Sequence, residues 1–287
     1  MSRPGTHPAS HPMPSRYGVI GHPIAHSRSP AIHAAFARQT GQDLVYDRIL
    51  GQLEDFPGDV RRFFAAGGLG LNVTVPFKEQ AWALVDERAP RAETAGAVNT
   101  LIALPDDRLR GDNTDGPGLV RDLVDNLGLA LAGRHILLVG AGGAARGVVR
   151  PLLETGIAEL FIANRTAAKA ASLAAAASRF GPAQGGGLDA LAGRRFDLII
   201  NATSAGLGGA LPALPDGCLA SQGWVYDLVY GEGAQSFLDW GRGQGATLAI
   251  DGLGMLVEQA AEAFFLWRGM RPDTADVIAA LRNGTLA

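Results

Sequence analysis

The stretch 135–147, HILLVGAGGAARG, decides how the second half of this chain folds. An apolar run, residues 136–139, stops abruptly at Gly140, and small residues lead from there into a helical pattern. This order predicts a buried strand, a tight turn and a helix N-terminus, whose free backbone N–H groups favour a phosphate. The spacing Gly140-x-Gly142-x-x-Ala145 fits the dinucleotide-binding fingerprint. Taken alone, it also fits a glycine-rich turn that binds nothing.

Composition excludes several classes of protein. The chain has 287 residues, enough for one large domain or two ordinary ones, and 47% of them are apolar against 18% charged. A net charge of −3, from 25 basic and 28 acidic residues, gives no broad attraction to nucleic acid or to a membrane. The single cysteine, Cys218, rules out an intrachain disulfide and is typical of a reducing compartment.

No segment has the character of a membrane span or a secretion signal. No apolar run reaches the roughly 18 residues that a spanning helix needs. The first 15 residues, rich in Pro, Ser and His, lack the apolar core of a signal peptide and predict a disordered tail. We therefore expect a cytoplasmic protein.

The first half alternates short apolar runs with helical stretches. Pro30 suits the first turn of a helix that ends at Gly41. A hairpin is expected around the turn at residues 105–107, Pro-Asp-Asp. The predicted strands are 17–20, 44–50, 70–75, 98–103 and 108–111, and the predicted helices are 30–41, 53–66 and 77–85.

The second half repeats the alternation and predicts a parallel, doubly wound sheet with right-handed crossovers. The Ala-rich run 167–177 is interpreted as a crossover helix, because Ala is the best helix former. Two further helices close the chain with no strand after them. The predicted strands are 136–139, 160–163, 198–201, 225–228 and 247–250, and the other predicted helices are 116–127, 253–267 and 273–281.

The residues after the second strand of this unit indicate which cofactor it takes. An NAD site normally has an acidic side chain there, whereas an Arg accommodates a 2′-phosphate. Here the sequence is Asn164-Arg165-Thr166-Ala-Ala-Lys169, so a guanidinium and an ammonium replace the carboxylate. The alternative is two solvated charges, but positive charge at a helix start is mildly unfavourable without an anion. The pattern favours NADP.

Two loops of the first half carry polar groups. Ser27 and Ser29 precede a helix, and the local alternative to a binding role is that Ser29 caps this helix with Pro30 at its first position. Capping leaves Ser27 unexplained. Three histidines lie nearby, at positions 22, 26 and 33, but prolines interrupt any single helix that would align them, and no metal site is expected.

Two more blocks place charged side chains at the ends of predicted elements. The block 72–78, NVTVPFK, puts Lys78 just beyond a strand end. The block 111–116, GDNTDG, clusters two carboxylates before the helix that leads into the second unit. Each has a simpler interpretation, a solvated lysine and a capping loop.

Taken together, these blocks resemble the shikimate dehydrogenase family from about Tyr17 to the final helices. Eight blocks occur in order: GHPIAHSRSPAIH, NVTVPFKE, AGAVNTL, GDNTDG, GAGGAARG, NRT, NATSAG and DGLGMLVEQA. The resemblance implies an NADP-dependent enzyme that reduces 3-dehydroshikimate to shikimate. It also implies an α/β fold of two domains: a substrate domain, 16–115 plus about 252–287, and a Rossmann-type NADP domain, 116–251. The final helices would pack back on the substrate domain.

The resemblance also assigns roles to single residues. Lys78 and Asp115 match the catalytic pair of the family and would also touch the substrate. The two serines would bind the substrate carboxylate, and other polar side chains would contact its hydroxyls or line its site: Thr74, Asn99, Tyr230 and Gln259. Residues implied in cofactor binding are Gly140, Ala141, Gly142, Gly143 and Ala144 at the pyrophosphate, Asn164, Arg165, Thr166 and Lys169 at the 2′-phosphate, and Leu228 and Gly252 near the nicotinamide.

The chemistry of the reaction agrees with these residue types. Hydride transfer to a ketone creates an alkoxide, which needs a proton donor or a cation within hydrogen-bond reach. Lys78 offers the charge and Asp115 would orient it, and the residues leave open which of the two is the formal donor. The competing hypotheses are a paralogue that also oxidises quinate and a non-catalytic NADP(H) sensor. A monomer or homodimer with a small-molecule substrate is expected.

Overall fold

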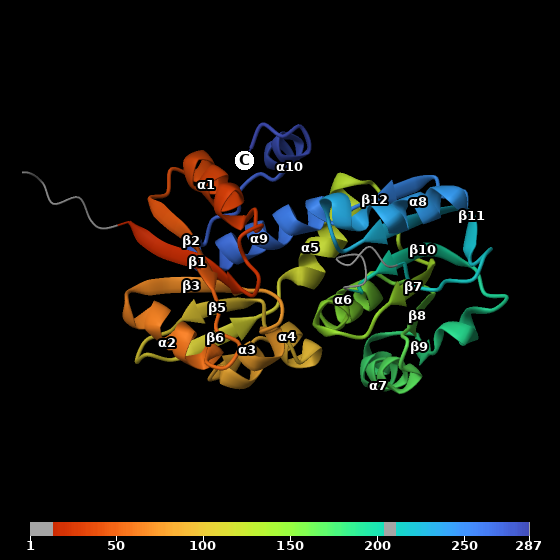
Figure 1. The fold of residues 1–287 in the computed structure, drawn as a ribbon, viewed down its shortest axis with the longest axis horizontal. Coiled ribbons are helices and arrows are strands. Elements are labelled where there is room, and N and C mark those ends of the chain that lie inside the picture. The colour runs from red at the N-terminus through yellow and green to blue at the C-terminus, as the bar shows by residue number, and fades with distance from the viewer. Residues whose placement is uncertain (1–13, 204–210, 287) are drawn as a thin grey trace, which may run out of the picture.

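Two six-stranded sheets lie side by side in the computed structural model, each flanked by helices (Figure 1). The structure describes residues 14–203 and 211–286. The predicted N-terminal tail falls almost wholly outside these ranges, although Ser15 already belongs to the first strand. The two-unit α/β fold expected from the alternating pattern is confirmed.

The first sheet is mixed and has the strand order β2-β1-β3-β5-β6-β4. Its first three strands are parallel, whereas β5 runs antiparallel to both β3 and β6. The hairpin predicted around residues 105–107 is therefore present. The strands are β1 (Ser15–Gly21), β2 (Leu44–Leu50), β3 (Gly68–Val73), β4 (Glu87–Arg88), β5 (Thr100–Ala103) and β6 (Leu109–Asp112).

The second sheet is parallel throughout and has the order β12-β11-β10-β7-β8-β9. Alternate residues of its central strand β7 enter two separate cores, Ile136 and Leu138 on one face and Leu137 and Val139 on the other. Helices cover both faces, as predicted for a doubly wound sheet. The strands are β7 (His135–Val139), β8 (Glu159–Ala163), β9 (Ala183–Gly186), β10 (Phe196–Asn201), β11 (Leu219–Asp227) and β12 (Leu248–Ile250).

Most predicted helices are present, with shifts at their ends that have local causes. Helix α2 begins at Phe56 and not at Leu53, because the Asp55 carboxylate caps it by accepting the N–H of Gly58. Helix α4 was not predicted, and the helix predicted at 116–127 consists of α5 followed by a π-helical turn over residues 122–126. The helices are α1 (Ser29–Thr40), α2 (Phe56–Ala65), α3 (Lys78–Leu84), α4 (Pro90–Ala95), α5 (Asp115–Arg121), α6 (Gly143–Glu154), α7 (Ala167–Ala177), α8 (Gln235–Gly243), α9 (Leu253–Arg268) and α10 (Ala275–Arg282).

The chain passes between the two halves through α5 and returns through α9 (Figure 1). These two helices approach closely where a Cβ on Gly118 would lie 2.7 Å from the backbone N of Gln259. Helix α9 then packs on the first half, where Val257 and Phe264 share a core with Ile32 and Phe36 of α1. The expected return of the final helices is therefore confirmed.

Candidate active site

A buried ion pair lies where α3 and α5 begin. Lys78 is the first residue of α3 and Asp115 the first of α5, and Lys78 Nζ donates to Asp115 Oδ2 at 2.5 Å. Their side chains are 16% and 8% exposed, so little water screens the interaction. The antiparallel hairpin β5–β6 brings these residues together across 37 positions of sequence. The pair places a cation against a carboxylate beyond the carboxyl ends of β3 and β6 in the first sheet.

Asn99 fixes the carboxylate of this pair. Its Nδ2 donates to Asp115 Oδ1 at 2.7 Å and to Thr114 Oγ1 at 3.0 Å, while its Oδ1 accepts the backbone N–H of Thr114 at 2.8 Å. Each oxygen of Asp115 therefore has its own donor. A carboxylate held in this way keeps its orientation when the lysine exchanges partners.

A layer of buried polar side chains extends from Asn99 beneath the site. Thr100 Oγ1 donates to Asn99 Oδ1 at 2.8 Å, and Asn72 Nδ2 donates to Thr100 Oγ1 at 3.1 Å. Tyr46 on β2 then donates to Asn72 Oδ1 at 2.7 Å. We call Tyr46, Asn72, Asn99, Thr100 and Thr114 the polar floor. Of these, sequence reasoning assigned a role only to Asn99. Asn72 and Thr100 stood inside matching blocks, whereas nothing marked Tyr46.

The two serines lie together at the start of α1. Ser27 Oγ donates to Ser29 Oγ at 3.2 Å and accepts the N–H of Ser29 at 3.3 Å, and both side chains are buried. The alternative that Ser29 caps α1 is wrong, because the helix begins at Ser29 and no side chain caps it. Ser29 Oγ accepts from Ser27 in this arrangement, which leaves the O–H of Ser29 to donate to a ligand. Arg48 Nε holds this loop by donating to the Ser27 carbonyl at 2.8 Å.

Gln259 and Tyr230 reach this region from elements far along the chain. Gln259 on α9 has its Oε1 3.4 Å from Thr114 Oγ1, and its Nε2 donates to the carbonyl of Leu256. Tyr230, after β11, packs against the core that α1 shares with α9. Burial raises the pKa of the Tyr230 hydroxyl, and the charges of Arg28 and Arg48 act against this rise. Tyr230 is therefore close to the cationic loop that carries the serines.

Thr74 comes directly after the last residue of β3, at the same end of the first sheet as the ion pair. Its N–H donates to the carbonyl of Ile20 at 2.9 Å, and its side chain is half-buried. A Cβ on Gly21 would lie 2.4 Å from Thr74 Cγ2, so the two strand ends are in close contact. No described hydrogen bond connects Thr74 to the Lys78–Asp115 pair.

The glycine turn of the second sheet approaches the same pair. Gly140 has φ +119°, which an L side chain rarely adopts, and a Cβ there would lie 3.0 Å from the carbonyl oxygen of Ala202. Helix α6 begins at Gly143, so the N–H groups of its first turn have no partner within the helix. A Cβ on Gly143 would lie 3.9 Å from the Cβ of Lys78. The turn and the ion pair are therefore immediate neighbours.

Three of the predicted 2′-phosphate residues, 164–166, lie between β8 and α7, and Lys169 lies in the first turn of α7. Asn164 Nδ2 donates to the carbonyl of Thr166 at 3.0 Å and shapes the loop, while Arg165, Thr166 and Lys169 are exposed. Two cations and a helix N-terminus at one place form a donor set that fits a dianionic phosphate. This chemistry, together with the open space above Gly142, fits NADP.

Leu228 and Gly252 lie against each other at the ends of β11 and β12. A Cβ on Gly252 would lie 2.4 Å from the carbonyl oxygen of Leu228, so only glycine fits. Below them Asn201 Nδ2 donates to Asp227 Oδ2 at 2.9 Å, and Asp227 Oδ1 accepts the N–H of Val229. Burial raises the pKa of Asp227 to about 6. Sequence reasoning did not single out this carboxylate.

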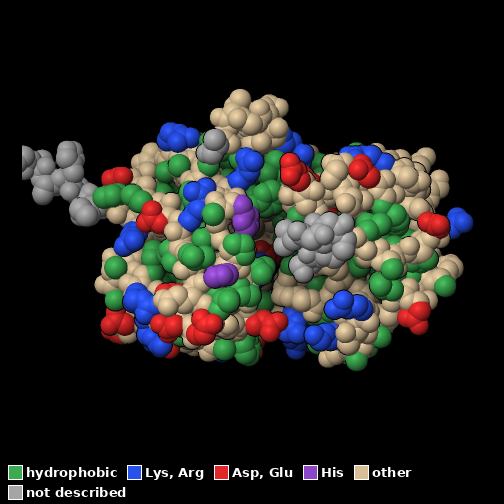
Figure 2. Space-filling view, in the orientation of Figure 1, with side chains coloured by type: hydrophobic (Ala, Val, Ile, Leu, Met, Phe, Trp, Pro, Cys, Tyr) green, Lys and Arg blue, Asp and Glu red, His purple; other side chains and the backbone are tan. Residues whose placement is uncertain are grey.

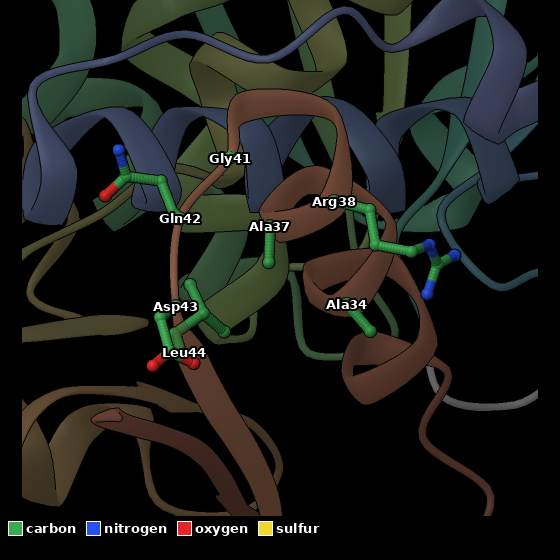
Figure 3. Close-up of a pocket in the computed structure, with 7 residues that line it drawn as sticks. All are labelled: Ala34, Ala37, Arg38, Gly41, Gln42, Asp43 and Leu44. Carbon is green, nitrogen blue, oxygen red and sulfur yellow. The ribbon is translucent and has the colours of Figure 1, made fainter. Parts of the chain in front are cut away.

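A furrow separates the two halves on the face shown in Figure 2. A different depression, beside the C-terminal part of α1, contains none of the predicted site residues (Figure 3). Its lining residues are Ala34, Ala37, Arg38, Gly41, Gln42, Asp43 and Leu44. Within residues 14–203 and 211–286, no group of three or more His, Cys, Asp or Glu side chains could hold a metal ion. No helix of these ranges is long and apolar enough to cross a membrane.

A parallel sheet with a glycine turn, facing a mixed sheet that holds a lysine–carboxylate pair, defines a two-unit, dinucleotide-dependent oxidoreductase. Three family models match in order: "Shikimate dehydrogenase substrate binding domain" over residues 19–101, "Shikimate / quinate 5-dehydrogenase" over 122–207 and "Shikimate 5'-dehydrogenase C-terminal domain" over 252–282. The chain belongs to the shikimate dehydrogenase family.

Individual relatives cover almost the whole chain. The shikimate dehydrogenase (NADP(+)) of Alkalilimnicola ehrlichii is 58% identical over 270 residues, which are 94% of this chain and 99% of that protein. An Ael1 enzyme from Pseudomonas putida is 48% identical, with a TM-score of 0.85 over 93% of this chain and 98% of its own. A Thermus thermophilus shikimate 5-dehydrogenase, solved with NADP(H) and shikimate, is 34% identical, with a TM-score of 0.80 over 94% and 99%.

Proposed function

We propose that this protein catalyses the reversible, NADPH-dependent reduction of 3-dehydroshikimate to shikimate, a step in chorismate and aromatic amino-acid biosynthesis. The observation that carries the proposal is the buried Lys78–Asp115 pair, 2.5 Å between Nζ and Oδ2, beside the glycine turn. The relatives named shikimate dehydrogenase (NADP(+)) support it over nearly the full chain.

The pair performs the proton chemistry. Bound NADPH supplies the hydride that reduces the carbonyl. As negative charge develops on the carbonyl oxygen, the Lys78 ammonium stabilises it, and a proton passes from the Lys78–Asp115 pair to that oxygen. Asn99 keeps the carboxylate oriented through its 2.7 Å bond to Oδ1. In the reverse direction the pair accepts the proton of the hydroxyl group.

The substrate is held by neutral donors and acceptors that the first sheet and α9 present. Ser27 and Ser29 bind its carboxylate, with Tyr230 closing the same end. Thr74, Asn99 and Gln259 contact its hydroxyls. Asn99 and Gln259 both contact Thr114 of the polar floor, at 3.0 and 3.4 Å, so their positions are set before a substrate binds. A substrate that lacks a hydroxyl would leave such a buried group without the partner it is placed to meet.

The second sheet holds NADP. The N–H groups from Gly140 to Ala144 would bind the pyrophosphate at the start of α6. Arg165 and Lys169 would bind the 2′-phosphate with Asn164 and Thr166. Leu228 would give an apolar surface to the nicotinamide, and Gly252 allows this surface to form by its close contact with the Leu228 carbonyl.

The organisation of the chain follows from these assignments. We place the substrate domain at residues 16–115 plus 252–287 and the NADP domain at 116–251, after a tail, 1–15. The core that α9 shares with α1 supports assigning the last segment to the first domain. The buried free thiol of Cys218 is consistent with a reducing cytoplasm. The protein would act as a monomer or homodimer.

A substrate panel tests the function. The purified protein is mixed with NADPH and 3-dehydroshikimate, and the fall in NADPH absorbance is followed; no fall would refute the proposal. Shikimate and quinate are then each oxidised with NADP and with NAD. We expect shikimate with NADP to give the highest kcat/KM.

Broader use of polyhydroxylated substrates is the second candidate. One family model is described as shikimate / quinate 5-dehydrogenase, and a Gluconobacter relative that is 31% identical is a 5-ketofructose reductase. The same fold therefore carries other ketone substrates. Quinate has one hydroxyl more than shikimate, and a kcat/KM for quinate equal to that for shikimate would establish this candidate.

A further inference from the structure

One guanidinium on the short helix α4 joins two other elements of the site. Arg91 Nε donates to Asp112 Oδ1 at 2.6 Å and its Nη2 to Oδ2 at 3.1 Å, which is a bidentate pair. Arg91 Nη1 and Nη2 also donate to Glu262 Oε1, at 3.0 and 3.1 Å. A planar fork can satisfy both carboxylates at once, and an ammonium cannot.

The two carboxylates stand next to proposed site residues. Asp112 ends β6, three positions before Asp115, and it accepts the N–H of Asn113 at 2.7 Å. Glu262 lies on α9, three positions after Gln259, so the two share one side of the helix. Arg91 therefore connects the strand end that carries Asp115 with the helix that carries Gln259.

The charged groups of this cluster are largely buried, and each has a partner of opposite charge. The side chains of Asp112 and Glu262 are 3% and 12% exposed, and that of Arg91 is 26% exposed. Burial acts to raise the pKa of Glu262, but the hydrogen bond from Arg271 and the charge of Arg91 outweigh it and hold this pKa below its ordinary value. Buried charges persist only where such partners hold them in defined positions. The cluster therefore fixes geometry on three elements.

A second contact joins the same elements on the side of the ion pair, where Thr114 Oγ1 lies 3.4 Å from Gln259 Oε1. Arg91 is an additional link between them, through Asp112 on β6 and Glu262 on α9. We propose that Arg91 is a positioning residue for the reaction: through Asp112 it sets Asp115 against Lys78, and through Glu262 it sets Gln259 against the substrate. The inference rests on the proposed function, because it takes the roles of Asp115 and Gln259 from it.

Separate variants of the two carboxylates distinguish the two branches. Asp112→Asn weakens the link to Asp115, and we expect kcat to fall about tenfold or more with KM for 3-dehydroshikimate within about threefold, since small misplacements of reacting groups cost up to about 100-fold in rate. Glu262→Gln weakens the link to Gln259, and we expect mainly a rise in KM. Arg91→Met should show both effects, and Arg91→Lys should recover only part of the activity.

The control is Arg108→Met, which breaks an exposed pair, 2.8 Å apart, between Arg108, just before β6, and Glu87 on β4. It should leave kcat and KM unchanged. NADPH affinity, measured by fluorescence, shows that each variant is folded, because the nucleotide site lies on the other sheet. If folded Asp112→Asn and Glu262→Gln variants lose only melting temperature and keep wild-type kcat and KM, the inference is wrong. Failure of the wild-type protein to reduce 3-dehydroshikimate would refute the proposed function itself.

Discussion

The two halves of the site differ in how their polar groups are satisfied. On the first sheet, Asn99 and Thr100 of the polar floor are buried and bonded to neighbouring side chains. On the second sheet, Arg165 and Lys169 are exposed, and the glycine turn presents backbone N–H groups. The first half is organised before a ligand arrives, whereas the second presents donors that a ligand must complete.

This difference follows from what each half must recognise. A small polyol is distinguished by the positions of its hydroxyl groups, which rigid, buried partners read best. A dinucleotide carries large fixed charges, which exposed cations and helix N-termini bind without a preformed network. The two halves should therefore respond differently to substitution, to salt and to pH.

The largest effect is expected at the centre of the organised half. Lys78→Ala removes the charge that meets the developing alkoxide and should lower kcat by about 10²- to 10⁴-fold while shikimate still binds. Steady-state kinetics and calorimetric titration with shikimate measure the two quantities. Glu79→Gln, one residue further along the same helix and exposed, is the control. Turnover near wild-type in Lys78→Ala would remove Lys78 from its role.

The open half should show a loss confined to the cofactor. The double variant Arg165→Ala and Lys169→Ala should raise KM for NADPH about 10- to 100-fold, the range for hydrogen bonds to charged groups, and leave KM for NADH nearly unchanged. The difference in KM for NADPH between the double variant and the wild type should shrink as salt is added, because these side chains are exposed and salt screens their charge. Equal losses with both cofactors would show that the two cations do not select the 2′-phosphate.

Substitutions of two glycines in the same turn should have different effects, one on folding stability and the other on NADPH binding. Gly140→Ala forces a side chain into φ +119° and against the Ala202 carbonyl, and should destabilise the protein by about 1 to 3 kcal/mol. Gly142→Ala has no neighbour within 4 Å of the added Cβ, so it should melt like the wild type. A methyl group there would still block close approach of a pyrophosphate and weaken NADPH binding. Thermal melts measure the stability of both variants, and titration with NADPH measures their cofactor binding. Equal melting temperatures for Gly140→Ala and the wild type would contradict the strain expected at Gly140.

The smallest effect is expected in the pH dependence of folding stability, because each half contains a buried titratable group with a shifted pKa and the two shifts act in opposite directions. Burial lowers the pKa of His33, stacked on Tyr46, from 6.5 to about 3, and raises that of Asp227 from 3.8 to about 6. Below pH 6.5 the unfolded chain protonates His33 and the folded one does not, so acid destabilises the fold there. Between pH 6 and 3.8 the folded chain protonates Asp227 first, so acid stabilises it. Each effect amounts to about 1 kcal/mol per pH unit.

Two variants measure these opposing contributions. His33→Phe should make the melting temperature less sensitive to acidification from pH 6.5 to 4.5, because the group that resists protonation is gone. Asp227→Asn should make it more sensitive, because the compensating proton uptake is lost. Parallel pH profiles for both variants and the wild type would contradict the two opposite shifts.

Much of the fold could be predicted from local patterns. Strand β2 and helix α7 have the predicted bounds, because each is set by residues adjacent in sequence: Val, Tyr and Ile, which favour strands, in one case and a run of alanines in the other. Strand β9 could not be predicted: Ala-Gln-Gly-Gly has no β-branched residue, and it is a strand only because β8 supplies its hydrogen bonds. Tertiary pairing decided that element.

The candidate site divides in the same way. The glycine turn could be recognised from its own spacing, whereas Lys78 and Asp115 were assigned as a pair only through the resemblance of the eight blocks taken together. Nothing in a motif pointed to Tyr46, whose hydroxyl reaches from β2 across β1 to Asn72 on β3, or to Arg91, whose partner Glu262 lies 171 positions away. Residues that act through long-range contacts carry no local signature. The alternative in which Ser29 caps α1 is excluded by local structure, since Ser29 is itself the first residue of the helix and its own N–H donates to Ser27 Oγ.

The return of α9 to the first half has a consequence for synthesis on the ribosome. The core around Ile32 and Phe36 lacks Val257 and Phe264 until the last helices have been made. A chain growing from its N-terminus can therefore complete the second sheet while the first still exposes apolar surface. The half that recognises the substrate is the first to be translated and the last to be finished, so stop codons late in the reading frame should be as damaging as early ones.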